Sequence, residues 1–185
     1  MATREQIRSA ALPLFERHGI ADISVAEIAD AAGIDEAEFY ELFAAPVNVV
    51  LDNDHYARLL DIFVSESAQL SPSGAWIVAL DEAASAMDAT VWANETARQR
   101  IVDSDPAVAP FLVPFGLSVM ELTKQAVATR TGLPADSNKV AAFAGALIGS
   151  IAGMPSGSFA APQSWIAAHA GANEALGASL DKLLQ

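Results

Sequence analysis

The stretch SVAEIADAAGIDEAEFYELF, residues 24–43, decides how the first part of the chain folds. Ser24 stands three residues before Glu27, which is the spacing of a capping box at the start of a helix. Gly33 then occupies the place where a left-handed residue ends a helix at little steric cost. Between these signals the apolar residues recur at helical spacing, at Val25, Ile28, Ala29 and Ala32. The pattern predicts a short helix followed by a tight turn.

A second helix is predicted directly after that turn. Asp35 can cap it, with Glu38 at the third helical position. Phe39, Tyr40 and Phe43 form its apolar side. A helix, a turn that contains glycine and a second helix make up a helix-turn-helix, whose second helix normally enters the DNA major groove.

Residues 4–47 resemble the DNA-binding domain of the tetracycline-repressor (TetR) family of bacterial regulators. The residues that carry the resemblance are Ile7, Ala10, Ala11, Leu14, Phe15, Gly19, Ser24, Val25, Ile28, Ala29, Ala32, Gly33, Ile34, Phe39, Tyr40 and Phe43. The resemblance implies an all-α fold, with a three-helix helix-turn-helix domain over residues 1–45. A larger helical domain for ligand binding and dimerisation would follow over residues 46–185. The implied function is that of a dimeric transcriptional regulator that responds to a small ligand.

The charges of this segment depart from the family pattern. The charged side chains of the expected recognition helix are all acidic, and residues 1–47 carry three arginines against nine carboxylates, a formal charge of −6. The residues expected to lie nearest DNA are Arg4, Ser24, Asp35, Glu36, Glu38 and Tyr40. Phosphate neutralisation supplies essentially all non-specific DNA affinity, so these carboxylates oppose binding. A carboxylate can still accept a hydrogen bond from a cytosine amino group.

Two interpretations of the domain therefore stay open. In the first, the protein binds operator DNA as the family resemblance implies. In the second, the fold is retained, DNA binding is lost, and the protein acts as a ligand-binding module or binds a protein partner through its acidic domain.

Composition limits the function classes further. The chain has 185 residues, a formal net charge of −13, 52% hydrophobic residues and no cysteine. Disulfides and cysteine-based zinc sites are thereby excluded, which is consistent with a cytoplasmic protein. The charged start lacks a signal core, and the longest apolar run, residues 140–154, is too short to span a bilayer, so no membrane partner is expected.

The rest of the chain has a helical pattern and no strand pattern. Helices are expected over residues 3–18, 46–69, 75–88, 90–103, 115–130, 137–154 and 162–184. Pro13 predicts a kink or a late start in the first of them. The apolar stretch 107–115 contains Pro110 and Pro114, and we expect that it cannot form one regular helix.

Three glycines spaced by four suggest an interface between helices. Gly145, Gly149 and Gly153 would form one stripe, which permits the close approach of another backbone. The resemblance implies a dimer built by the last two helices. The expected interface residues are Gly145, Gly149, Gly153, Trp165, Leu176 and Leu180. Close packing within one monomer is the alternative.

Large aromatic and methionine side chains gather in the middle helices, where the resemblance implies a ligand pocket. They are Tyr56, Phe63, Trp76, Met87, Trp92, Phe111, Phe115 and Met120. Such a set suits a small apolar ligand with one or two polar groups. The alternative is that these side chains are simply core.

The sequence offers no support for an enzyme. His18, His55 and His169 are far apart and have no metal-ligand spacing, and neither a phosphate-binding loop nor a nucleophile elbow is present. We therefore expect no catalytic residues, no metal and no cofactor.

Overall fold

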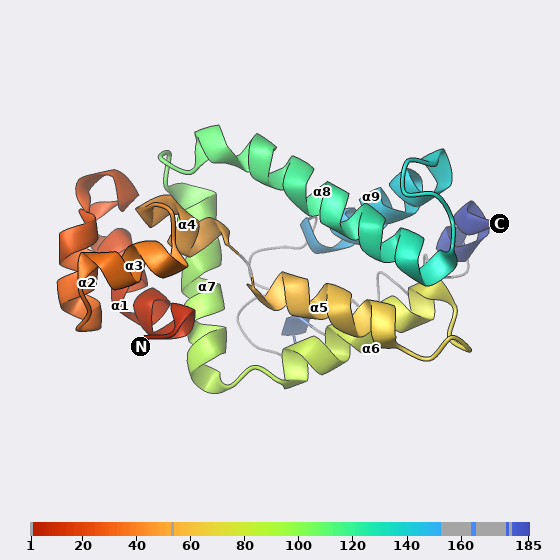
Figure 1. The fold of residues 1–185 in the computed structure, drawn as a ribbon, viewed down its shortest axis with the longest axis horizontal. Helices are drawn as coiled ribbons and strands as arrows, with labels where there is room; N and C mark the ends of the chain where they lie inside the picture. Colours follow the sequence, from red (N-terminus) through yellow and green to blue (C-terminus); the bar gives the residue numbers. More distant parts are fainter. Residues whose placement is uncertain (1, 53, 153–163, 166–176, 178) are drawn as a thin grey trace. The chain divides into compact units, whose positions relative to one another are not determined.

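The computed structural model describes residues 2–52, 54–152, 164–165, 177 and 179–185. All regular structure in these ranges is helical, which confirms the predicted all-α class (Figure 1). The chain divides into two compact units. Unit 1 comprises Met1–Asn53 and Met87–Val113, and unit 2 comprises Asp54–Ala86 and Pro114–Gln185.

Unit 1 is organised around α1, Arg4–His18, which packs against α2, Val25–Ala32, α4, Pro46–Leu51, and α7, Ala89–Ser104 (Figure 1). The 3₁₀ turn η1, Ile20–Asp22, follows α1, and α3, Glu36–Leu42, follows α2. Side chains from α1, α2 and α3 close the core, where Ile7, Ala11, Phe15, Ile28 and Phe39 are almost wholly buried. The helices α4 and α7, which lie beyond the predicted domain boundary after residue 45, pack on α1 as well.

The first helix begins where its cap is and does not start late. Thr3 caps α1, since its hydroxyl accepts from the backbone amide of Gln6 while the Gln6 side chain accepts from the amide of Thr3. The helix then continues unbroken through Pro13.

The predicted helix over residues 46–69 is wrong, because the structure contains two shorter helices there. Pro46 takes the first position of α4 as expected, but α4 ends at Leu51 and α5 is Asp54–Ser65. Arginine side chains from α1 and α7 donate to the last carbonyls of α4. Those donors stabilise a helix end that no local signal predicts.

Unit 2 contains α5, α6, Pro72–Ser85, most of α8, Ala109–Thr131, α9, Asn138–Ala152, and η3, Lys182–Leu184. The helices α5 and α6 lie side by side (Figure 1). Its most deeply buried apolar residues are Phe63, Ala75, Trp76, Ala79, Val127, Val140, Phe143, Ala144 and Leu147.

The expectation that residues 107–115 cannot belong to one regular helix is also wrong from Ala109 onwards. Pro110 lies in the first turn of α8, where no intrahelical amide donor is needed. Pro114 lies inside the helix, which continues past it to Thr131. One proline removes a single donor at its own position and leaves the other turns hydrogen-bonded.

Candidate functional site

The helix-turn-helix has the local geometry that its sequence predicts. The Ser24 hydroxyl accepts from the amide of Glu27, and the Glu27 carboxylate accepts from the Ser24 amide at 2.8 Å. Gly33 is left-handed, with φ of 70°, and Asp35 accepts from the Glu38 amide at 2.8 Å. These caps orient α3 as the second helix of the motif.

The outer surface of this motif is acidic. Glu27, Asp30, Asp35, Glu36 and Glu41 are exposed there, and no lysine or arginine lies in either helix. Tyr40 is 56% exposed, although its ring also meets Phe39 edge-on. The hydrogen bonds from Ser24 lower the pKa of the Glu27 carboxyl, so it remains ionised at neutral pH.

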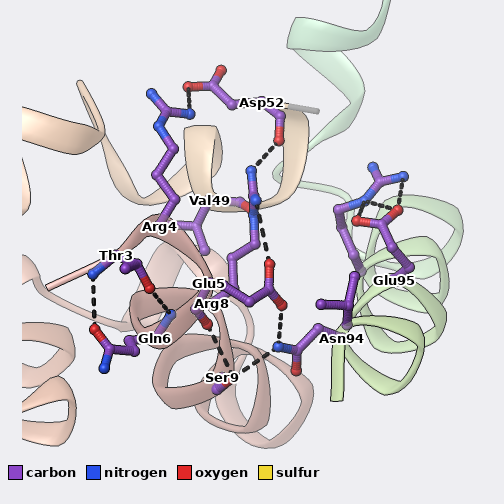
Figure 2. Close-up of polar contacts among 12 residues, drawn as sticks. Thr3, Arg4, Glu5, Gln6, Arg8, Ser9, Val49, Asp52, Asn94 and Glu95 are labelled. Carbon is purple, nitrogen blue, oxygen red and sulfur yellow. Dashed lines mark hydrogen bonds and ion pairs between the residues drawn. The ribbon is translucent and has the colours of Figure 1, made fainter. Parts of the chain in front are cut away.

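Arg4, which the sequence predicts to lie near DNA, is directed at its own domain. Its guanidinium lies 3.2 Å from the Asp52 carboxylate (Figure 2). It also donates to the carbonyl of Leu42 at the end of α3 and lies over the Phe43 ring at 4.6 Å. The side chain therefore neutralises a carboxylate and completes the end of the recognition helix.

Arg8 and Arg98 were not among the predicted site residues, yet they dominate the polar interior of unit 1. Arg8 is 2% exposed and donates to the carbonyls of Val49 and Asp52 (Figure 2). Arg98 is 7% exposed, pairs with Glu95 at 2.9 Å and donates to the Val50 carbonyl at 2.9 Å.

The spacing of three residues between Glu95 and Arg98 was the one sequence signal for the pair. The Val50 carbonyl, which also accepts from Arg98, lies 48 positions away, and no sequence signal indicated that contact.

Unit 1 has a strongly negative formal charge even when its remaining arginines are counted. Arg100 pairs with Glu16 at 2.6 Å, and Arg17 donates to the Pro13 carbonyl at 3.0 Å. Counted over the two segments of unit 1, five arginines stand against fourteen carboxylates, a formal charge of −9. A surface of this sign repels a polyanion.

A hollow of about 830 Å³ opens in unit 1 between the ends of α1 and α7. Its polar lining includes Glu16, His18, Asp22, Arg100, Ser104 and Asp105. The Asp105 carboxylate accepts from the amides of Ile20 and Ala107, so it holds η1 and the chain after α7 in place. No sequence pattern indicated this hollow.

Fold and motif define a helix-turn-helix protein. Residues 7–45 match the family model for bacterial regulatory proteins of the tetR family. The N-terminal helix-turn-helix region of the chain is therefore similar to that of this family of regulators. No curated protein matches the chain.

The predicted dimer residues lie in different environments. Gly149 on α9 is exposed, and no atom lies within 4 Å of the place where its Cβ would be. The same place at Gly145 lies 3.8 Å from the end of the Met120 side chain. Trp165 and Leu180 are buried within the chain at 9% and 7% exposure. Gly153 and Leu176 lie outside the described residues.

The predicted ligand residues fall in both units. Tyr56, Phe63, Trp76, Phe115 and Met120 belong to unit 2, whereas Met87, Trp92 and Phe111 belong to unit 1. Phe63 and Trp76 meet edge to face with ring centroids 5.6 Å apart, and the Tyr56 hydroxyl lies 2.6 Å from that of Thr123. Phe111 is 45% exposed.

The described ranges contain neither a candidate metal site nor a candidate membrane span. Within them, no group of three His, Asp or Glu side chains is arranged to hold a metal ion. No described helix combines the length and hydropathy of a bilayer span.

Proposed function

We propose that this TetR-family regulator acts as a ligand-responsive homodimer whose helix-turn-helix unit does not hold duplex DNA and instead binds a basic protein partner. Two features together support the proposal. The outer face of α2 and α3 is acidic, and Arg4 and Arg8 bond to their own domain and not to that face.

The magnitudes support this assignment. A carboxylate about 6 Å from a phosphate in water is repelled by roughly 0.7 kcal/mol, and more where solvent is excluded. Several such carboxylates in each of two subunits oppose a non-specific affinity of roughly 5–8 kcal/mol. The arginines cannot offset this repulsion without leaving α3 and α4, whose carbonyls they satisfy.

Direct reading of an operator is the second candidate, and the intact motif favours it. The caps and the left-handed Gly33 keep α3 in the arrangement that DNA readers use. Exposed carboxylates and Tyr40 could then contact base edges, with cytosine amino groups as the donors.

Dimerisation is supported by the open backbone at Gly149, which leaves room for a helix from a second copy. Ligand binding is supported by the large aromatic side chains in the interior of unit 2. Light scattering after gel filtration tests the dimer, and a monomer at micromolar concentration would refute it.

Fluorescence anisotropy with random-sequence duplex DNA tests the main proposal. We expect no binding by the unmodified protein between about 50 and 200 mM salt. The matched variant E36K/E41K changes two exposed side chains of α3 and should bind at low salt, with affinity that falls as salt rises.

Salt-dependent binding by the unmodified protein, at the strength of the variant, would contradict the proposal. Enrichment of one sequence from a random duplex library, in the absence of non-specific binding, would favour the second candidate. Binding of a fluorescent lysine-rich peptide by the unmodified protein, lost in E36K/E41K, would support the partner-binding function.

A further inference from the structure

The interior of unit 2 contains a fully buried residue, Trp76, whose hydrogen-bond donor has no acceptor among the described residues. Trp76 lies on the buried side of α6 and is 0% exposed. Its indole N–H has no acceptor among the residues that the structure describes. Buried donors are rarely left in this state, because they lose their bonds to water on folding and gain nothing in return.

The other buried polar side chains in the described part of unit 2 are satisfied within the fold. The Thr123 hydroxyl donates to the Val119 carbonyl at 2.7 Å and lies 2.6 Å from the Tyr56 hydroxyl. The Ser73 hydroxyl donates to the Asp181 carboxylate at 2.7 Å. Trp76 is thus the exception among the buried residues described in unit 2. The other buried atom without a hydrogen bond in the described residues, His55 Nε2, belongs to a half-buried residue at the start of α5.

The described neighbours of Trp76 on α5 and α6 include large and small apolar side chains. Its ring meets Phe63 edge to face, and Ala75, Ala79 and Leu80 are buried beside it on α6. The nearby cation, Arg130, lies over Phe63 at 5.4 Å and donates to backbone carbonyls at the end of α5. The buried charged side chains of the described residues, which are Arg8, Glu95 and Arg98, all belong to unit 1.

We propose that unit 2 binds an uncharged, largely apolar small molecule whose carbonyl or ether oxygen accepts a hydrogen bond from the indole N–H of Trp76. The inference rests on the ligand-binding part of the proposed function and names the chemical class of the ligand. Apolar pockets orient their ligands through a few polar groups, and Trp76 supplies such a group. A charged ligand would lose its hydration without gaining a buried partner of opposite charge.

Two probes of the same shape test this proposal. Acetophenone carries a carbonyl oxygen where α-methylstyrene carries a methylene group. In the unmodified protein, acetophenone should move the indole N–H resonance of Trp76 downfield, whereas α-methylstyrene should not. The ratio of the two affinities, from ligand-detected NMR titration, should fall about tenfold in Trp76→Phe, which retains a ring and removes the donor.

A second substitution covers the case in which Trp76→Phe fails to fold. Benzothienylalanine at position 76 keeps the bicyclic shape and replaces the N–H by sulfur, and it should abolish the same preference. An equal ratio in the unmodified protein and the substituted proteins would overturn the role of Trp76 while leaving ligand binding intact. If neither probe binds the unmodified protein, the ligand-binding part of the proposed function fails, and this inference fails with it.

Discussion

Unit 1 and unit 2 use their buried polar groups in opposite ways. In unit 1, Arg8 and Arg98 are buried and donate to the carbonyls at the end of α4, and Glu95 neutralises Arg98. In unit 2, no charged side chain is buried among the described residues, and the buried donor of Trp76 has no described acceptor. The two buried arginines of unit 1 are therefore engaged within the fold, whereas unit 2 retains a buried donor without a described acceptor.

The largest effect should come from removing the buried cation of unit 1. Arg98→Met leaves Glu95 buried without its partner and the Val50 carbonyl without its donor. The free energy of unfolding of unit 1 should therefore fall by about 3–5 kcal/mol. Hydrogen exchange followed by mass spectrometry measures this loss separately in α4, α7 and unit 2.

The double variant Glu95→Leu/Arg98→Met is the control, because it removes both charges and should recover much of that loss. An equal loss of protection in both units would show that they unfold together and would break the comparison.

A smaller effect is expected from the equivalent change in unit 2. Arg130 is half-buried and donates to the carbonyls of Phe63, Glu66, Ser67 and Leu70, beyond α5 and at its end. Arg130→Met should lower the free energy of unfolding of unit 2 by about 1–3 kcal/mol and should increase hydrogen exchange of the α5 amides.

Lys124→Met, on the same helix, is the matched control. Its ion pair with Glu121 spans one turn at the surface, so the change should stay within about 0.5 kcal/mol. A larger effect from Lys124→Met than from Arg130→Met would contradict the assignment of Arg130 as the capping group.

An alkaline titration should sharpen the comparison further. Burial raises the pKa of the Tyr56 hydroxyl, although its hydrogen bond to Thr123 acts in the opposite direction. As pH rises, the Tyr56 hydroxyl therefore loses its proton in the unfolded chain before it does so in the folded protein. The contribution of the buried, protonated hydroxyl to the free energy of unfolding is complete below pH ~10 and is lost as pH rises through the folded pKa. In urea unfolding of unit 2, Tyr56→Phe should reduce this alkaline decline in the free energy of unfolding. An unchanged decline in the variant would contradict the role assigned to Tyr56.

The smallest effect concerns the first helix of the motif. The hydrogen bonds of Ser24 lower the pKa of the Glu27 carboxyl. The contribution of the Glu27 carboxylate to the stability of α2 is therefore present above pH ~4.5 and is lost as pH falls through the folded pKa. The protection factors of the α2 amides, which correct for the intrinsic pH dependence of exchange, should fall on acidification, and Glu27→Gln should remove that fall. A Glu36→Gln variant, whose residue is exposed on α3, should leave it in place.

Local signals predicted α2 and α3 well, because their caps act over three or four residues. The Ser24–Glu27 box, the left-handed Gly33 and the Asp35 cap are all present as expected. The break between α4 and α5 was not predictable in this way. The Val49 and Val50 carbonyls there bond to arginines 41 and 48 positions away.

The sequence by itself determined the helix-turn-helix and the sign of its charge, since both follow from residue types and short spacings. Only the tertiary structure decided where the few arginines point and which donors stay without an acceptor. Burying an arginine requires a carboxylate or carbonyl partner, and here packing between helices far apart in the chain supplies the carbonyls.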